Sequence, residues 1–375
     1  MEFGIFIQGH VPQHRSAQDP GYEHTSFLND VAMVRAADES GFKYVWASEH
    51  HFLDEYSHLS ASEVFLAYLG GITERIHLGS AIWNITPPVN HPVRVAERVA
   101  MMDHLTGGRF EFGMGRGAGA LEVTGFDIPD TDATKPMFEE VVKEFPKMWH
   151  DAEYSFDGEF FKVPPRNVLP KPFKKPHPPM WQACGNPPTF EVAARKGLGA
   201  IGFNFSAAPA MKPMVDAYKN AIGEAEPIAD YVNDNVMITN SVVCLEDGRR
   251  AREVAAGMGS GRLQSLVFRY HTTFPKPAHV PDWPETLPEP TLDEVNWRIN
   301  EGFLLCGDPD EVLEQVRKYE DVGADQVVFG LPIDMPIEAA IETIRLFGKH
   351  VIPKLDPDPE HRTSRFRDAA AVPTP

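Results

Sequence analysis

The chain has 375 residues, 42% of them hydrophobic, and carries a formal net charge of −19 at pH 7. A chain of this length can bury a sizeable core, either in one large α/β barrel or in two smaller domains. The negative charge argues against a nucleic-acid partner, because such binding relies on Lys and Arg side chains that neutralise phosphates.

Short apolar runs alternate with longer amphipathic segments along the chain, which is typical of repeated β/α units around a parallel sheet. The runs predict eight strands, at residues 2–7, 44–47, 76–83, 110–114, 179–183, 200–205, 236–243 and 326–331. Eight parallel strands close a barrel. We therefore predict one (β/α)8 TIM-like barrel with insertion segments, over residues 1–353.

Two segments interrupt this alternation: residues 154–178, rich in Pro and aromatic side chains, and residues 257–300, which contain FPKPAHVPDWPETLPEP. Long loops inside a compact domain are often lids or entrance walls, and the alternative is a surface excursion. Residues 354–375 have little to bury, so we predict a mobile C-terminal tail.

Cysteine usage and the lack of long apolar runs indicate the compartment. The three cysteines, Cys184, Cys244 and Cys306, are far apart and lack metal-type spacing, so no disulfide framework is expected. No stretch approaches the roughly 20 apolar residues of a membrane span, and the N-terminus lacks a signal-peptide pattern. We expect a cytoplasmic protein without a membrane partner.

The sequence VWASEHHF ends the second predicted strand with Glu49, His50 and His51. A parallel barrel places its chemistry at the C-terminal ends of its strands. Imidazole titrates near neutrality, so a histidine here can hold or relay a proton. The alternative is a histidine that satisfies strand-end backbone groups. We expect no metal site, because adjacent residues on an extended chain point to opposite sides.

A glycine-flanked arginine, Arg116, follows the fourth predicted strand within RFEFGMGRGAG. This stretch matches G-x-G-x-x-A, but it does not open a helix directly, which disfavours a dinucleotide-binding fold. A guanidinium between glycines could approach a phosphate closely, or it could be a surface arginine on a tight turn. Asn186 and Thr189 begin a helix after the fifth predicted strand, where they could bind an anion or serve as ordinary caps.

Taken together, these motifs resemble the bacterial luciferase-like flavin-dependent monooxygenase family over roughly residues 1–353. The resemblance is carried by SEHHF, LGSAIW, HPVRVAERVAMMDHLTGGRFEFGMGRG and GADQVVFG, in this order and spacing. It implies a TIM-like barrel that binds reduced FMN from a separate flavin reductase. It also implies a reaction with oxygen, through a flavin hydroperoxide, that oxygenates a small organic substrate.

The resemblance also implies roles for particular residues. His50 matches the catalytic histidine, and Glu49, which precedes it as in the luciferase pattern, is predicted to be catalytic with it. The Ala81–Ile82 bond matches a non-prolyl cis peptide beneath the flavin ring. The remaining matches are phosphate-binding positions: Arg116, Lys135, Asn186 and Thr189. A homodimer packed through helices beside the early strands is a further implication.

Departures from the luciferase pattern leave alternatives open. Lys135 replaces a phosphate arginine and lacks its bidentate fork. Gly115, Gly185 and Asn186 stand where luciferase has a reactive cysteine, a glutamate and a serine, so light emission from a long-chain aldehyde is not expected. The family also includes deazaflavin-dependent hydride-transfer enzymes. A third possibility is a non-catalytic flavin-binding relative or a partner subunit that retains only the fold.

The sequence does not specify the substrate. Four aromatic residues favour an apolar or aromatic pocket, although aromatic side chains in loops also serve as packing. They are Trp181, Phe268, Phe274 and Trp283.

Overall fold

The computed structural model describes residues 1–203 and 207–371. Eight parallel strands form a closed barrel, in which β12 pairs with β1 on one side and with β10 on the other. The barrel strands are β1 (Glu2–Ile7), β2 (Tyr44–Ala47), β3 (His77–Ser80), β5 (Phe110–Gly115), β8 (Met180–Cys184), β9 (Gly199–Gly202), β10 (Val236–Cys244) and β12 (Gln326–Gly330). The predicted TIM-like barrel is therefore confirmed.

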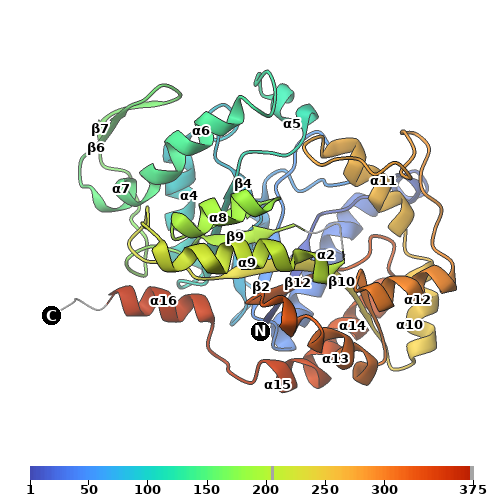
Figure 1. Cartoon of the computed structure of the whole chain (residues 1–375). Helices are drawn as coiled ribbons and strands as arrows, with labels where there is room; N and C mark the ends of the chain where they lie inside the picture. The colour runs from blue at the N-terminus through green and yellow to red at the C-terminus, as the bar shows by residue number, and fades with distance from the viewer. Residues whose placement is uncertain (204–206, 372–375) are drawn as a thin grey trace.

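Helices pack around the barrel and across its two ends (Figure 1). They are α1 (Gln13–Ser16), α2 (Tyr22–Glu39), α3 (Ser62–Gly70), α4 (Pro92–Leu105), α5 (Ala120–Gly125), α6 (Thr134–Val141), α7 (Phe145–His150), α8 (Pro187–Arg195), α9 (Lys212–Ala221), α10 (Gly248–Ala256), α11 (Ser260–Tyr270), α12 (Leu292–Glu301), α13 (Pro309–Arg317), α14 (Ile337–His350), α15 (Ile352–Leu355) and α16 (Arg362–Ala371). Among the described residues, no helix is long and apolar enough to cross a bilayer.

All eight predicted strands are present, with differences at their ends. The third is broken after Ser80, and its continuation, β4 (Trp83–Asn84), pairs with β5. Part of the sixth prediction, residues 204–205, lies outside the described residues. The structure adds β11 (Leu304–Gly307), which pairs with β10 outside the barrel ring. It also adds a hairpin, β6 (Tyr154–Asp157) with β7 (Lys162–Arg166), inside the first predicted insertion.

The barrel interior is filled by large side chains rather than left as a pore. Trp46 and Trp181 cross edge to face inside it, with ring centroids 5.1 Å apart. Gly79 makes room for this packing, because a Cβ there would come within 2.2 Å of the Trp46 ring. Trp181, which the sequence suggested as a pocket residue, thus belongs to the interior.

The C-terminal segment is not a mobile tail as far as the structure describes it. α16 lies across the lower side of Figure 1, on the side of the N-terminus. Arg367 is 2% exposed, and its guanidinium donates to both carboxylate oxygens of Asp103, at 3.0 and 2.8 Å. The Thr363 hydroxyl donates to Glu111 at 2.6 Å. The prediction was wrong because this segment is held by polar contacts rather than by an apolar face; residues 372–375 lie outside the described part.

Candidate active site

Neighbouring strand ends carry the residues that the sequence singled out. β2 leads into His50, β3 into the Ala81–Ile82 bond, β5 into Arg116 and β8 into Asn186. β2 pairs with β3, β3 with β5, and β5 with β8, all in parallel. These residues therefore lie along one arc of the C-terminal rim, where barrel enzymes place their chemistry.

His50 pairs with a carboxylate that the sequence analysis did not identify, Glu122 of α5. The Nδ1 atom of His50 lies 3.1 Å from Glu122 Oε1, and the backbone N–H of His51 donates to the same oxygen at 2.8 Å. Burial alone would raise the pKa of Glu122, but the charge of His50 and these hydrogen bonds hold it below its usual value. An ionised carboxylate only accepts hydrogen bonds, so Nδ1 carries the proton toward Glu122 and Nε2 is left for proton exchange.

Glu49 points away from His50 and holds the loop after β4. Its Oε1 atom accepts from the backbone N–H of Asn84 and from the side-chain amide of Asn90, each at 3.2 Å. His51 Nε2 lies 3.6 Å from the same oxygen, an ion-pair distance rather than a hydrogen bond. Burial raises the pKa of Glu49 despite this neighbour. The geometry gives Glu49 a positioning contact beside the Ala81–Ile82 bond, not a contact with His50.

Two further aromatic side chains enclose His50. The rings of Tyr56 and His271 have centroids 5.4 and 5.5 Å from the imidazole of His50. The Tyr56 hydroxyl is hydrogen-bonded to His271 Nε2 at 2.9 Å. Burial, followed by the charge of His50, lowers the pKa of His271 to about 3, and burial raises the pKa of Tyr56. Both partners are therefore uncharged near neutral pH.

The Ala81–Ile82 peptide bond is cis, as the resemblance implied. The side chain of Ile82 lies against β5: a Cβ built on Gly115 would come within 2.5 Å of Ile82 Cδ1. A side chain at position 115 would therefore displace Ile82.

Arg116 is half-buried and fixed by one of its nitrogens. Nη1 donates to the Thr131 carbonyl at 2.7 Å and to the Thr134 hydroxyl at 2.9 Å. Burial lowers the pKa of the guanidinium, yet arginine stays charged in proteins. Within residues 1–203 and 207–371, Nε and Nη2 donate to no protein group, which leaves them for an anion such as phosphate.

Asn186 and Thr189 cap α8 reciprocally. The backbone N–H of Thr189 donates to Asn186 Oδ1, and that of Asn186 donates to Thr189 Oγ1, each at 3.2 Å. Pro187 and Pro188 follow the cap and contribute no N–H groups. The capping role is therefore observed, and anion binding here would use the amides and hydroxyl of the cap itself.

Lys135 pairs with a surface carboxylate rather than with another candidate site residue. Its side chain is 59% exposed, and its ammonium pairs with Asp132 at 2.6 Å. The preceding residue, Thr134, is the one that contacts Arg116.

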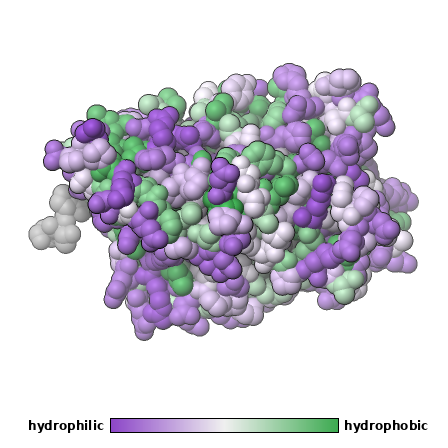
Figure 2. All heavy atoms as spheres, turned by 90° about the horizontal axis from the view of Figure 1, so that it is seen from above, coloured by the Kyte–Doolittle hydropathy of each residue, from purple (hydrophilic) through white to green (hydrophobic). Residues whose placement is uncertain are grey.

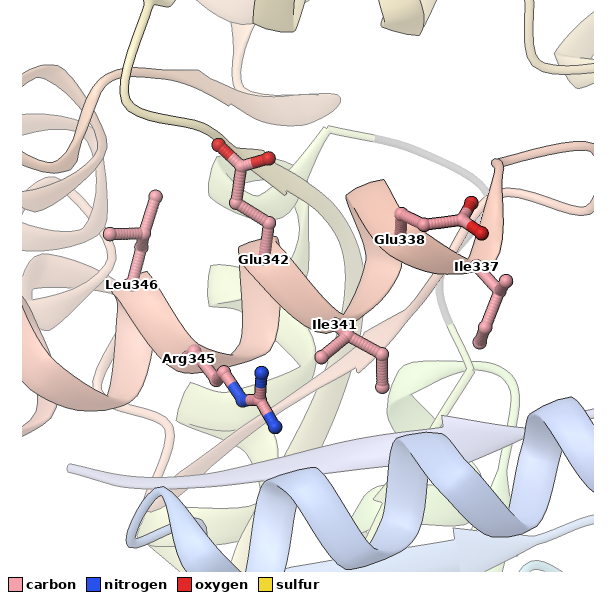
Figure 3. Close-up of a pocket in the computed structure, with 6 residues that line it drawn as sticks. All are labelled: Ile337, Glu338, Ile341, Glu342, Arg345 and Leu346. Carbon is pink, nitrogen blue, oxygen red and sulfur yellow. The ribbon is translucent and has the colours of Figure 1, made fainter.

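A separate surface hollow of about 500 Å³ lies on the outer face of α14 (Figure 3). Its lining side chains all come from that helix: Ile337, Glu338, Ile341, Glu342, Arg345 and Leu346. It includes none of the candidate residues. Figure 2, which views the molecule from above, shows apolar patches within a largely hydrophilic surface.

Comparison with known sequences gives the family of this chain. A profile of the luciferase-like monooxygenase family matches residues 1–326. The uncharacterized protein y4wF of Sinorhizobium fredii is 26% identical over 353 residues, 92% of this chain and 94% of that protein. The oxygenase component of the flavin-dependent trigonelline monooxygenase of Acinetobacter baylyi is 26% identical over 199 residues, 52% of each chain.

Solved structures share the fold. Monooxygenase RslO1 of Streptomyces bottropensis superposes with a TM-score of 0.76 at 24% identity, covering 94% of this chain and 99% of that one. The oxygenating constituent of 3,6-diketocamphane monooxygenase from Pseudomonas putida, in complex with FMN, gives 0.74 at 18%, covering 94% and 98%. An F420-dependent secondary alcohol dehydrogenase gives 0.67 at 16%, covering 94% and 98%. The family profile spans most of the chain, and the chain folds into the same barrel as these structures. This chain therefore belongs to the luciferase-like monooxygenase family.

Proposed function

We propose that this protein is the oxygenase component of a two-component monooxygenase, which uses reduced FMN and oxygen to oxygenate a small organic substrate. The observation that carries the proposal is the His50–Glu122 pair, 3.1 Å apart at the C-terminal rim, on the same arc as Arg116 and the Ala81–Ile82 bond. A separate flavin reductase would supply the reduced cofactor, as the name of the Acinetobacter relative as an oxygenase component suggests.

The residues at the rim fit FMN. The uncommitted donors of Arg116 suit a phosphate, with the α8 cap of Asn186 and Thr189 beside it. The isoalloxazine ring would lie against the Ala81–Ile82 strand, next to Gly115. Lys135 would have to leave Asp132 to reach the phosphate, so its share in binding would be small. When bound, reduced FMN would supply the oxygen chemistry, through a flavin hydroperoxide.

The chain's own contribution would be control of one proton. Glu122 holds His50 with its Nδ1–H inward, so Nε2 is the atom that takes or gives the proton. A fixed imidazole beside the flavin would donate a proton to the reduced oxygen while an oxygen atom is transferred to the substrate. We expect loss of this control to release hydrogen peroxide instead of product.

A homodimer is part of the proposal. α3 and α4 follow the early strands β2 and β3, and they expose four apolar side chains: Val64, Tyr68, Met101 and Leu105. Exposed apolar groups of this kind mark interaction surfaces. The cytoplasmic location also remains a prediction from the sequence.

Anaerobic titration with reduced FMN and with a reduced deazaflavin tests the cofactor. We expect reduced FMN to bind, Arg116→Ala to weaken binding at least about tenfold through loss of a charge-assisted contact, and Lys135→Ala to weaken it less than about threefold. Preference for the deazaflavin, with anaerobic hydride transfer, would replace the proposal with the hydride-transfer alternative that one structural neighbour illustrates. Failure to bind either cofactor would favour a partner subunit that retains only the fold.

A further inference from the structure

The second predicted insertion docks across the rim through α11. On one side it holds the loop that follows His50: the Arg262 guanidinium pairs with the buried carboxylate of Glu55 at 2.6 Å. The Tyr270 hydroxyl donates to the carbonyl of Asp54 at 3.1 Å. Apolar contacts reinforce this docking, because Leu266 and Val267 of α11 pack with Tyr56.

On its other side the same segment holds the turn that precedes Glu122. The backbone N–H of Thr273 donates to the Ala118 carbonyl at 3.3 Å, and the backbone N–H of Ala120 donates to the Thr272 hydroxyl at 3.1 Å. Residues 260–273 therefore tie together the two loops that supply His50 and Glu122. The segment is a wall of the site rather than a surface excursion.

His271, at the end of α11, is the residue that this wall places against the site. Its ring lies 5.5 Å from that of His50, and its Nε2 is hydrogen-bonded to the hydroxyl of Tyr56, on the loop after β2. His50 is thus enclosed by two side chains that are bonded to each other and come from segments 215 positions apart.

The charges around this pair come from several segments. Glu122 of α5 and His50 face it, His10 after β1 lies edge to face with Tyr56 at 5.7 Å, and the Glu55–Arg262 ion pair anchors α11 nearby. Burial lowers the pKa of His10 to about 3. His10, Tyr56 and His271 are therefore neutral neighbours of the His50–Glu122 pair. The charged neighbours are the Glu55–Arg262 pair and His51, whose pKa, despite its burial, is raised by Glu49 and Glu122.

We propose that Tyr56 and His271 form a neutral hydrogen-bonded pair that positions His50 for proton transfer. The proposal rests on the proposed function, because His50 acts there on the oxygen chemistry of the flavin. Tyr56 and His271 are positioning residues: they act through His50 and need not touch the substrate.

The test compares variants that keep or break the bond in the reaction of bound reduced FMN with oxygen, in which FMN is re-formed and oxygen is reduced to hydrogen peroxide. We expect Tyr56→Phe and His271→Leu to speed peroxide release at least about tenfold, because a misplaced catalytic group loses its advantage. Reduced FMN binding should stay within about twofold. His271→Gln can still bond to Tyr56 and should retain slow release, and the double variant Tyr56→Phe/His271→Leu should be no worse than either single change.

Tyr270→Phe is the matched control, because it removes a hydroxyl from the same docked helix without touching His50. Equal effects of Tyr56→Phe and Tyr270→Phe, or of His271→Leu and His271→Gln, would overturn the proposal. A second readout does not depend on the flavin: in ¹⁵N-histidine NMR, the His271 signal, assigned by its loss in His271→Gln, should stay neutral above about pH 5. Titration of His271 near neutrality would overturn the pair even if oxygen chemistry is found. An inert wild-type complex whose His271 is neutral would contradict the proposed function alone.

Discussion

The two ends of the barrel carry the same kind of histidine–glutamate pair, but the pKa of the carboxyl group shifts in opposite directions. At the N-terminal end, His77 Nδ1 lies 2.7 Å from Glu111 Oε1; at the C-terminal rim, His50 Nδ1 lies 3.1 Å from Glu122 Oε1. Burial raises the pKa of Glu111 to about 8 and lowers that of His77 well below its usual value. The pKa of Glu122 is lowered instead. Near neutral pH, Glu111 therefore keeps its proton beside a neutral His77, whereas Glu122 is ionised.

The two carboxyl groups differ in pKa because the N-terminal pair is covered more completely. The ring of His361, just before α16, stacks on that of His77 at 3.7 Å, and Thr363 of α16 donates to Glu111. Glu122 is 6% exposed where Glu111 is 0% exposed, and it is supported by the backbone N–H of His51 and by the imidazole of His50. A histidine–glutamate pair therefore becomes structural where a helix closes over it, and remains able to exchange protons at the rim.

Breaking the seal should have the largest effect. Arg367→Ala leaves the buried carboxylate of Asp103 without its partner, so we expect the free energy of unfolding to fall by about 3 to 5 kcal/mol. Urea denaturation followed by circular dichroism measures this loss. Arg365→Ala is the control: its ion pairs with Asp358 and Glu360 are exposed, so it should cost at most about 1 kcal/mol. Similar losses in both variants would show that α16 does not seal the barrel.

Removing the charge of the rim pair should affect chemistry rather than folding. Glu122→Gln keeps a hydrogen-bond acceptor but no longer stabilises a protonated His50, so we expect peroxide release about 10- to 100-fold faster, with reduced FMN binding nearly unchanged. Rapid-mixing absorbance with a peroxide assay measures it. Glu49→Gln is the matched control, since that carboxylate contacts Asn84 and Asn90 instead. Equal peroxide release by Glu122→Gln and Glu49→Gln would contradict the role of Glu122 in stabilising a protonated His50.

The neutral pair should appear as a pH dependence of the free energy of unfolding, with the smallest change per step of one pH unit. The pKa of Glu111 is raised in the folded protein, so the native state binds its proton more tightly than the unfolded state does. Its contribution to stability is complete below about pH 4.5 and is lost as the pH rises toward about 8. Glu111→Gln should flatten this fall by up to about 1.4 kcal/mol per pH unit.

The measurement is urea unfolding of both proteins across this range. Other buried acids such as Asp30, whose pKa is also raised to about 8, are present in both proteins and cancel in the difference. An unchanged slope would mean that Glu111 is ionised, and the contrast between the two ends would disappear.

Much of the barrel could be predicted from sequence because its signals are local. Each barrel strand is a short apolar run, and all eight were predicted. β11 was not predicted. Its sequence, LLCG, is only four residues long and lies next to the end of the predicted insertion 257–300. α16 was missed for a different reason: its stability comes from the contact of Arg367 with Asp103, 264 positions away, and such a partner leaves no periodic pattern.

The same reasoning applies to the site. His50 and Arg116 were found because strand ends and glycine-flanked arginines are visible in the sequence. Glu122 and His271 were not, because they reach His50 from α5 and from the end of α11, far away in the chain. Lys135 was placed by similarity alone, and the structure instead shows it in an exposed pair with Asp132.

The account's central claim is that His50 controls oxygen chemistry on a bound reduced flavin. Its most direct test is rapid mixing of the anaerobic complex of protein and reduced FMN with oxygenated buffer, for the wild type and for His50→Ala, while flavin absorbance and peroxide are recorded. We predict a long-lived oxygenated flavin in the wild type, and in His50→Ala retained flavin binding with much faster peroxide release. Equal peroxide release by both proteins would contradict the role of His50, and failure of the wild type to bind reduced FMN would contradict the claim as a whole.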